Sequence, residues 1–316
     1  MSENNKPSFV KVTEGDNEIR IDKWFKRNCK DISNILFQKL LRKNAIKING
    51  KKAKKDSVVF TGDEIRVPYV EPQERKEKKK SEPRGSQKQA DEIIKDNILF
   101  ENKDMMAINK PPGIAVQGGN KVNLCIDDLL RFISKERIRL VHRLDKDTSG
   151  VLLLAKTPNA AAKLAASFKT KDYTKIYWAL VKGVPEPQEG TIKMPLSIEM
   201  DGMQERTMLD EKKGKRAITH YRVVDKVSKV LSLVELIPET GRKHQLRVHM
   251  TEIGHPIVGD GKYGGKEAFI EGISKKMHLH ARSLFHPSIL GIKIDVTAPL
   301  PRHMKDSFKF FGLDEA

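Results

Sequence analysis

The sequence predicts an α+β protein in which helices pack on a mixed, mostly antiparallel sheet and a small α/β module precedes that sheet. Aliphatic runs of strand length, separated by turn residues, continue from Ile93 to about Pro301. Upstream, residues 71–92 lack aliphatic periodicity and carry a basic run, which is typical of a flexible linker. We therefore expect four parts: a flexible tail (1–18), the small module (19–70), a flexible basic linker (71–92) and the main domain (93–316).

The small module is predicted to contain two helices and several short strands. Apolar residues recur at helical spacing twice, first at Ile21, Trp24, Phe25 and Cys29, then at Ile32, Leu36 and Leu40. Asp31 or Ser33 can cap the second helix. Residues 45–52 alternate and break at Asn49-Gly50, a strong hairpin signal, and residues 58–60 and 65–67 supply further strands.

Positive charge is concentrated in this module. Residues 20–55 hold thirteen Lys or Arg residues against two acids, a net charge of +11, and the whole chain carries +18 with a pI of about 9.7. Such a chain is attracted to polyanions such as nucleic acid. A solvated basic face on a structural domain is the alternative. We favour RNA binding because the bias is one-sided, with Arg20, Lys23, Arg42 and Lys43 as candidate contacts.

Composition narrows the class of protein. The mean hydropathy is −0.53, and no apolar run approaches the roughly 18–20 residues that span a bilayer. The first residues lack the pattern of a signal peptide. Cys29 and Cys125 are the two cysteines, which excludes a disulfide framework and a paired-cysteine metal site. We expect a cytoplasmic protein that contacts no membrane.

The elements of the main domain follow from its periodicities. Residues 98–110 are predicted to form a strand, a turn and a strand, and residues 124–133 and 160–168 to form helices. Further strands are expected at 175–183, 217–224, 231–237 and 292–296. No long internal repeat is visible.

The densest group of reactive side chains lies in the middle of this domain. Residues 140–150 read Leu-Val-His-Arg-Leu-Asp-Lys-Asp-Thr-Ser-Gly, and a continuous aliphatic run, 151–155, follows. This pattern predicts a strand, a polar loop and a buried strand. Rigid apolar walls around a polar loop suit a preorganised active site. A charged hairpin tip is the alternative.

The motif His142-Arg143-Leu144-Asp145-x-x-Thr148-Ser149-Gly150 resembles the signature loop of the RluA-type pseudouridine synthases. Matching blocks extend the resemblance over about 95–300: Lys110-Pro111-Pro112-Gly113, Lys175-x-Tyr177-x-Ala179, and Thr240-Gly241-Arg242-x-His244-Gln245-Leu246-Arg247-x-His249. The resemblance implies an isomerase that flips out a uridine of RNA, breaks its N-glycosidic bond and rejoins the base through carbon. Neither a metal nor another cofactor is required.

The resemblance also implies roles for individual residues. Asp145 is the catalytic carboxylate, although a nucleophile at C1′ and a base at C2′ remain open. Arg143 would fill the gap left by the flipped base, and His142 belongs to the same RNA-binding loop. Tyr177 would stack on uracil and serve as the base at C5, and Leu246 would pack under it. Arg242 would pair with Asp145, and Arg247 would contact substrate RNA.

Three other interpretations of the motifs are weaker. The histidines at 244, 249, 278, 280 and 286 lack the spacing of a metal site. The stretch Gly259-x-Gly261-x-x-Gly264 satisfies a dinucleotide fingerprint, but no βαβ unit surrounds it. A hydrolase built on Ser149, a His and an Asp lacks the usual nucleophile elbow.

The order of the N-terminal helices and strands resembles the S-four-like RNA-binding domain, and Gly118-Gly119 resembles a loop of the C branch, which acts on large-subunit (23S) rRNA. We therefore expect ribosomal RNA, naked or in an assembling particle, as the partner of a monomeric enzyme without a nucleotide cofactor. The alternatives are a D-branch rRNA or tRNA pseudouridine synthase, or a non-catalytic RNA-binding ribosome-assembly factor. The target uridines do not follow from the sequence.

Overall fold

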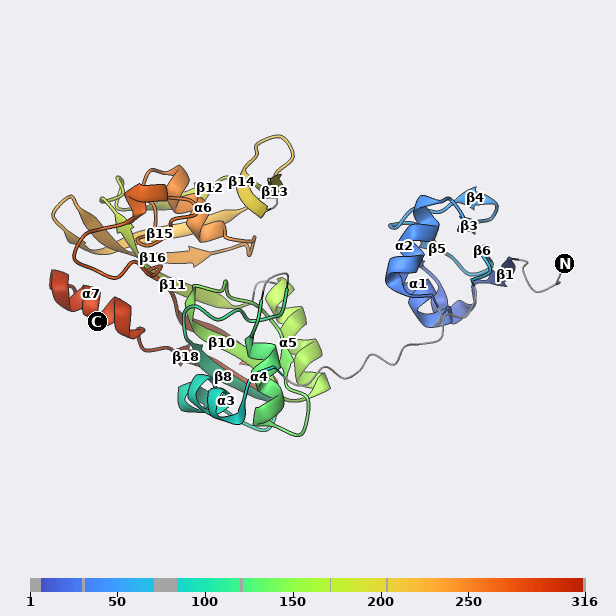
Figure 1. The fold of residues 1–316 in the computed structure, drawn as a ribbon, viewed down its shortest axis with the longest axis horizontal. Helices are drawn as coiled ribbons and strands as arrows, with labels where there is room; N and C mark the ends of the chain where they lie inside the picture. The colour runs from blue at the N-terminus through green and yellow to red at the C-terminus, as the bar shows by residue number, and fades with distance from the viewer. Residues whose placement is uncertain are drawn as a thin grey trace. The chain divides into compact units, whose positions relative to one another are not determined.

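The computed structural model describes residues 7–29, 32–70, 84–119, 122–170, 172–202 and 204–314 (Figure 1). The chain divides into two compact units, Met1–Ser81 and Glu82–Ala316. The predicted α+β class is confirmed: both units combine helices with sheets whose strand pairs are mostly antiparallel. No helix in these described ranges is long and apolar enough to cross a membrane.

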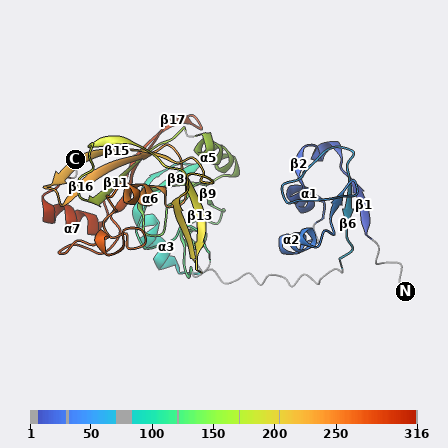
Figure 2. The same cartoon turned by 90° about the horizontal axis from the view of Figure 1, so that it is seen from above.

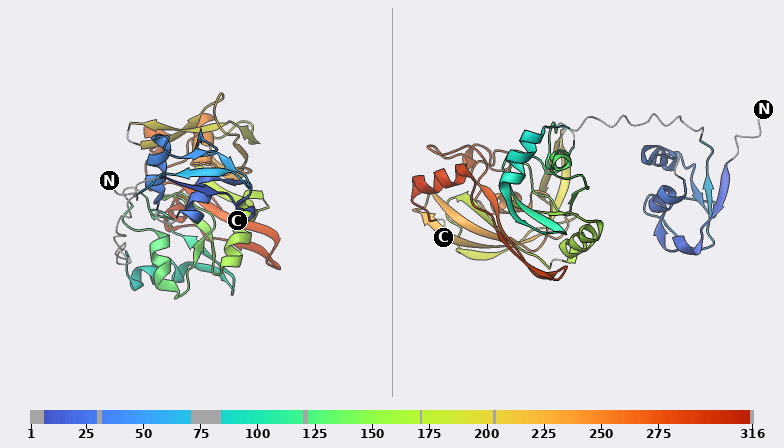
Figure 3. Two further views of the ribbon diagram at one scale, coloured as in Figure 1. Left: turned by 90° about the vertical axis from the view of Figure 1, so that its right-hand side faces the viewer. Right: turned by 90° about the horizontal axis from the view of Figure 1, so that it is seen from below.

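The N-terminal unit is a small sheet with two helices. Its sheet has the strand order β1-β6-β3-β4, and a second strand pair joins β2 to β5. Both helices lie on one side of the strands (Figure 3). The elements are β1 (Ser8–Lys11), β2 (Ile19–Arg20), α1 (Ile21–Asn28), α2 (Asn34–Arg42), β3 (Lys47–Ile48), β4 (Lys51–Lys52), β5 (Val58–Val59) and β6 (Glu64–Val67).

The apolar spacing, the helix cap and the turn residues of this unit have the structural roles that were predicted for them. Ile21, Trp24 and Phe25 of α1 are buried in one apolar cluster, as their spacing on one helix face requires. Ser33 caps α2 by accepting the backbone N–H of Leu36 at 3.2 Å, whereas Asp31 lies outside the described residues. Asn49 and Gly50 both have positive φ, the geometry of a tight hairpin turn, and β3 pairs with β4 across them.

The predicted flexible tail is partly wrong. Residues 8–11 form β1, which pairs antiparallel with β6, so that Val10 lies opposite Ile65. Val10 and Val12 contact the core of the unit, and Val12 is buried. The alternation of Val10 and Val12 is a strand signal too short to stand out in a polar segment, and a distant partner strand stabilises it. Residues 1–6 lie outside the described part.

The predicted linker is also too long at its C-terminal end. Residues 71–83 lie outside the described residues, but helix α3 (Gln87–Ile93) begins within the predicted linker. Ser86 caps this helix by accepting the backbone N–H of Gln89. Ala90 and Ile94 are fully buried in a core cluster of the second unit. The second unit therefore begins before residue 93, because the apolar residues at the end of this otherwise polar helix pack on its core.

The second unit is built on one ten-stranded sheet. Its strands run in the order β12-β15-β16-β11-β17-β10-β8-β7, while β18 pairs with β17 and β9 with β10. The one parallel pair among the described strands joins β10 to β17. The strands are β7 (Ile98–Glu101), β8 (Met105–Lys110), β9 (Arg139–Leu140), β10 (Ser149–Ala155), β11 (Thr174–Lys182), β12 (Glu189–Lys193), β15 (Ile218–Val227), β16 (Leu231–Pro238), β17 (Leu279–Ile289) and β18 (Ile292–Thr297).

Helices cover both faces of the sheet around β10. Successive residues of a strand point to opposite faces. Leu152 and Leu154 join the cluster under α3 and α4 (Ile126–Ile133), whereas Val151 and Leu153 join the cluster under α5 (Pro158–Thr170). Because both faces are buried, β10 is apolar throughout, as the predicted buried strand requires.

The other half of the sheet is covered in the same way (Figures 1 and 2). On β11, Ala179 contacts the cluster of α6 (Gln245–Glu252), while Trp178 and Leu180 contact that of α7 (Arg302–Phe311). A separate hairpin, β13 (Leu196–Asp201) with β14 (Gln204–Leu209), stands beside this half. The hairpin, β12 and β17 were not predicted from the sequence, since their apolar alternation is weak.

Candidate active site

The polar loop of residues 141–148 connects β9 to β10. Leu140 and Leu154 lie opposite each other in an antiparallel pair, which confirms the predicted strand, loop and buried strand. Gly150, the second residue of β10, has a φ of 110°, and a Cβ atom there would lie 2.2 Å from the carbonyl oxygen of Ala281. A side chain at this position would push β10 away from β17, so glycine is required where the two strands approach.

A buried lysine binds the backbone of the loop. Lys110 at the end of β8 is 0% exposed, and its Nζ donates to the carbonyls of Pro111 (2.7 Å), Ile114 (2.9 Å) and Lys146 (3.1 Å). Burial lowers the pKa of this amine to about 7, against the raising effect of Asp147 and Asp145. Because Lys146 follows Asp145 directly, the ammonium holds the backbone beside the carboxylate.

His142 and Ser149 hold the two ends of the loop. Nε2 of His142 accepts the backbone N–H of Leu153 at 2.8 Å, and burial lowers the pKa of this histidine to about 3. Ser149 is buried, and its hydroxyl lies 2.8 Å from Nδ1 of His280. Nε2 of His280 faces the Ala298 carbonyl, 3.2 Å away, and not a carboxylate. This arrangement disfavours a hydrolase triad on Ser149.

A cavity of about 540 Å³ opens above the loop, a volume in the range of small-molecule sites. The loop forms one wall, and the segment that leads into α6 forms another. Seven of the residues predicted for the site line this cavity: His142, Arg143, Asp145, Tyr177, Arg242, Leu246 and Arg247. The fold therefore brings together side chains that are separated by about a hundred positions in the sequence.

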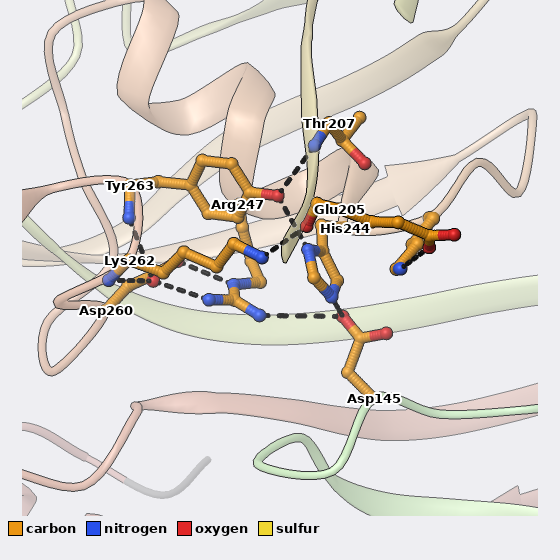
Figure 4. A network of polar contacts seen from close by, with 9 residues as sticks. Asp145, Glu205, Thr207, His244, Arg247, Asp260, Lys262 and Tyr263 are labelled. Atoms are coloured by element: carbon orange, nitrogen blue, oxygen red, sulfur yellow. Dashed lines mark hydrogen bonds and ion pairs between the residues drawn. The ribbon is translucent and has the colours of Figure 1, made fainter. Parts of the chain in front are cut away.

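Two side chains of the α6 region face the Asp145 carboxylate (Figure 4). Nε2 of His244 lies 3.8 Å from Oδ2 of Asp145, and Nη1 of Arg247 lies 4.0 Å from the same oxygen. Burial raises the pKa of Asp145, whereas the charges of Arg247, Arg143 and Lys243 lower it. The carboxylate is thus partly desolvated and surrounded by cations, which suits a group that reacts in its ionised form.

The predicted pairing of Arg242 with Asp145 is wrong. Arg242 is exposed at the edge of the cavity, and its Nε donates to the carbonyl of Arg216 at 3.1 Å. The buried arginine that faces Asp145 is Arg247, five residues later in the same motif. Residue 242 precedes α6, whereas residue 247 lies on the helix and points into the site. Sequence spacing could not separate two arginines of one motif.

Arg247 is fixed from the side opposite Asp145. Its Nε and Nη2 donate to the two oxygens of Asp260 at 2.7 and 2.6 Å, and its guanidinium lies 4.9 Å from the ring centroid of Tyr263. The side chains of Arg247 and Asp260 are 8% and 1% exposed. A buried bidentate pair of this kind orients a guanidinium in one plane.

His244, Asp260 and Tyr263 also belong to the site, although their sequence context predicted no role for them there. The Tyr263 hydroxyl lies 2.6 Å from Nδ1 of His244, and Asp260 holds Arg247. Asp260 and Tyr263 come from the glycine-rich stretch 259–264, which forms a loop against the site and no nucleotide-binding turn. Asp260 and Tyr263 could have been noticed in the sequence as polar residues within the Gly259-x-Gly261-x-x-Gly264 stretch, which does not form a dinucleotide site.

Tyr177 reaches the cavity from β11. The register of β11 against β17 shifts between Ile176 and Tyr177, and such bulges redirect side chains near active sites. Tyr177 and Leu246 pack in the same apolar cluster, consistent with the predicted contact between them. Burial raises the pKa of Tyr177, and the nearby Asp145 charge raises it further, so the phenol is protonated at neutral pH.

The remaining predicted residues belong to the other compact unit. Arg20, Lys23, Arg42 and Lys43 belong to the N-terminal unit and are exposed; Arg20 also forms an ion pair of 2.9 Å with Asp22.

Within the described ranges, no group of three or more His, Cys, Asp or Glu side chains could hold a metal ion. His249 and His278 are buried instead, bonded to Thr219 and Ser307 respectively.

Comparison with known proteins identifies the family. The profile of the RNA pseudouridylate synthases matches residues 104–252. Over 298 residues, the chain is 37% identical to the ribosomal large subunit pseudouridine synthase C of Rickettsia felis, an alignment that covers 92% of this chain and 95% of the relative. The chain belongs to the RNA pseudouridylate synthase family. It is therefore an isomerase.

Further relatives agree with this assignment. The pseudouridine synthase C of Salmonella typhi is 34% identical over 296 residues, covering 90% of this chain and 91% of the relative. The solved structure of human RNA Pseudouridylate Synthase Domain Containing 4 matches with a TM-score of 0.60 and 31% identity, covering 72% of this chain and 97% of that one. The range matched by the pseudouridylate synthase profile contains Asp145, Tyr177 and Arg247 but ends before Asp260 and Tyr263.

Proposed function

We propose that this pseudouridine synthase converts specific uridines of large-subunit (23S) ribosomal RNA to pseudouridine, with Asp145 as the reacting carboxylate. The observation that carries the proposal is the single cavity lined by Asp145, Tyr177 and Arg247. The relatives from Rickettsia felis and Salmonella typhi, both named for the large ribosomal subunit, support the choice of rRNA. The net charge of +18 also suits a polyanionic substrate.

The reaction requires an ionised carboxylate beside the sugar of a flipped-out uridine. Asp145 either attacks C1′ as a nucleophile or removes a proton at C2′, and both routes begin from the carboxylate. The contacts of His244 and Arg247 both fall on Oδ2 of Asp145, so we expect Oδ1 to be the oxygen that meets the ribose. Arg247, held by Asp260, would keep this geometry while the charge on Asp145 changes.

Tyr177 would stack on the detached uracil inside the cavity. The bulge in β11 beside Tyr177 and the apolar cluster that Tyr177 shares with Leu246 support this role. Proton removal from C5 by the Tyr177 phenolate requires a lower pKa than the free enzyme provides, because burial and the Asp145 charge both raise it. Asp145 would lose its negative charge once it is bound covalently to the sugar or protonated, and that loss would lower the pKa of Tyr177. Tyr177 could therefore act as a base only after Asp145 has reacted at the sugar.

RNA contacts outside the flipped nucleotide would come from cations of both units. Arg143 is exposed beside Asp145, and a planar guanidinium can stack in the space that a flipped base leaves. His142 would support that loop through its bond to Leu153, and Arg242 at the edge of the cavity would contact a phosphate. We also propose that the N-terminal unit is an S-four-like RNA-binding module, in which Arg20, Lys23, Arg42 and Lys43 would contact the rRNA backbone.

The proposal includes a monomeric enzyme that acts in the cytoplasm, where bacterial ribosomal RNA is made and assembled. Its substrate would be rRNA, either naked or within an assembling large-subunit particle.

Pseudouridine mapping tests the proposal. Carbodiimide labelling and reverse-transcription stops would be compared in a strain without this protein, in the complemented strain, and in a strain complemented with Asp145→Asn. We expect particular large-subunit stops to disappear with the protein and to return with the wild-type chain alone. If the stops change in tRNA and not in rRNA, the substrate would be tRNA instead of rRNA. If Asp145→Asn restored all of these stops, Asp145 would not be the reacting carboxylate.

A further inference from the structure

His244 and Tyr263 form a row with Asp145 that the proposed reaction does not use (Figure 4). His244 is the residue before α6 and directs Nε2 at Oδ2 of Asp145, 3.8 Å away. On the other edge of the imidazole, Nδ1 lies 2.6 Å from the hydroxyl oxygen of Tyr263. A distance of 3.8 Å is longer than a hydrogen bond, but such contacts in substrate-free enzymes often shorten when substrate binds.

The surroundings of His244 decide its protonation state. Charged and titratable groups face it from each element packed around it: Asp145 and Arg143 from the β9–β10 loop, Lys243 and Arg247 from the start of α6, and Lys262 and Tyr263 from the loop after α6. Burial, and after it the charges of the four cations, lower the pKa of His244 to about 3. The imidazole is therefore neutral at pH 7 and carries one proton.

Hydrogen bonding places that proton. An ionised carboxylate can accept but not donate, so the N–H belongs on Nε2, which faces Asp145. Nδ1 must then accept a hydrogen bond, and the Tyr263 hydroxyl is its donor at 2.6 Å. The hydroxyl oxygen in turn accepts the backbone N–H of Thr207 at 3.3 Å, which leaves the hydroxyl proton for His244.

Tyr263 connects the two side chains that face Asp145. Its hydroxyl holds His244, and its ring lies 4.9 Å from the guanidinium of Arg247. The positive φ of His244, 53°, places this residue just before the helix with its ring between Tyr263 and Asp145. A positive φ is uncommon for residues other than glycine and is maintained here by the surrounding contacts.

We propose that His244 and Tyr263 are a positioning pair for Asp145: Tyr263 fixes the Nε2–H form of His244, and that N–H steadies Oδ2 of Asp145 while Oδ1 reacts. This inference rests on the reacting role proposed above for Asp145. A neutral donor supports the carboxylate without adding a fifth charge to a site that already holds Arg143, Lys243, Arg247 and Lys262. Neither residue touches the reacting atoms, so both act through Asp145.

Two substitutions of His244 separate positioning from folding. The amide nitrogen of Gln reaches the place of Nε2, whereas the amide of Asn reaches only the place of Nδ1. Asn, however, tolerates the positive φ of position 244 better than Gln does. We expect His244→Gln to keep its single-turnover rate within about threefold of wild type and His244→Asn to lose about tenfold, although Asn is the more stable variant.

A second measurement does not depend on turnover. The carboxyl carbon of Asp145 can be followed by NMR through a pH titration of the full chain without RNA. Loss of the Nε2–H donor disfavours the carboxylate, so His244→Asn should increase its proton affinity about tenfold, and Tyr263→Phe should do so by a smaller factor. His244→Gln should leave it near the wild-type value. Tyr263→Phe keeps the ring against Arg247 and removes the hydroxyl alone.

The outcomes are distinguishable. Rates that follow the stability order, with Asn above Gln, would overturn the positioning role, as would an Asp145 titration that is identical in all four proteins. If the wild-type enzyme makes no pseudouridine on rRNA or tRNA, the proposed function fails, while the titration still tests whether the pair supports Asp145. Loss of rate in Tyr263→Phe without any change in the titration would also contradict the inference.

Discussion

Nη1 of Arg247 lies 4.0 Å from Oδ2 of Asp145. The other two nitrogens of the same guanidinium bind Asp260, so the arginine connects the β9–β10 loop to the loop after α6. Asp260 is buried and would carry an uncompensated charge without Arg247. One side chain therefore contacts the carboxylate proposed to react and maintains the contact between two loops distant in sequence.

Substitution of Arg247 should be far more damaging than substitution of Arg242. Arg247→Lys keeps the charge but cannot bind Asp260 through two nitrogens while facing Asp145, so we expect a single-turnover rate lower by about 100-fold. Arg242→Lys changes an exposed side chain bonded to a backbone carbonyl, and we expect a rate within about threefold of wild type. Rapid-quench measurement of pseudouridine compares the pair. The opposite order would restore Arg242 as the partner of Asp145.

The acid limb of the pH profile should report Asp145. Burial raises the pKa of this carboxyl above the ordinary value of 3.8, and Arg247, Arg143 and Lys243 oppose that shift. The role proposed for Asp145 requires its carboxylate form, so activity should be lost as pH falls through the raised pKa. We expect kcat/KM to fall at a pH above that of an ordinary aspartate, and removal of a neighbouring charge, as in Arg143→Gln, to move the limb higher. A limb that is the same in both proteins would contradict this assignment.

Lys110 should give the stability of the protein a recognisable pH dependence. Its pKa is about 7 in the folded protein and 10.5 in the reference state. The unfolded chain therefore binds more protons between these values, and stability rises with pH in that window. Relative to Lys110→Met, the wild type should gain about 2.5 kcal/mol between pH 6 and pH 9. Urea unfolding at each pH measures the difference, and a constant difference would show that Lys110 is charged throughout.

Removal of the N-terminal unit should weaken rRNA binding and flatten its salt dependence. The truncation should end at Ser81, because α3 belongs to the second unit. Each lost phosphate contact should reduce the slope of log K against log salt by about 0.7–0.9. Fluorescence anisotropy at several salt concentrations provides the slope, and an unchanged slope would show that the unit is not the RNA anchor.

Single substitutions in the N-terminal unit provide a matched pair. Arg42→Gln removes an exposed cation, whereas Arg20→Gln removes a cation already paired with Asp22. We therefore expect the larger change in salt slope for Arg42→Gln. Equal effects would indicate that Arg20 exchanges Asp22 for a phosphate when RNA binds.

Most elements, and the polar loop that contains Asp145, could be predicted from local sequence patterns. Periodicity placed α1, α2, α5 and β10 because the alternation of apolar residues reflects which face of each element is buried. The motif around Asp145 indicated a strand, a loop and a strand because apolar segments flank a polar turn. These are local properties, encoded within about ten residues.

The groups that meet Asp145 from distant parts of the chain could not be predicted in this way. Arg242 and Arg247 stand in one motif, but the start of α6 at Gln245 puts one at the surface and the other inside. His244 and Tyr263 join the site because the loop after α6 folds back against it, and β1 joins its sheet through β6. Such contacts depend on how whole elements pack against one another, and no short stretch of sequence contains that information.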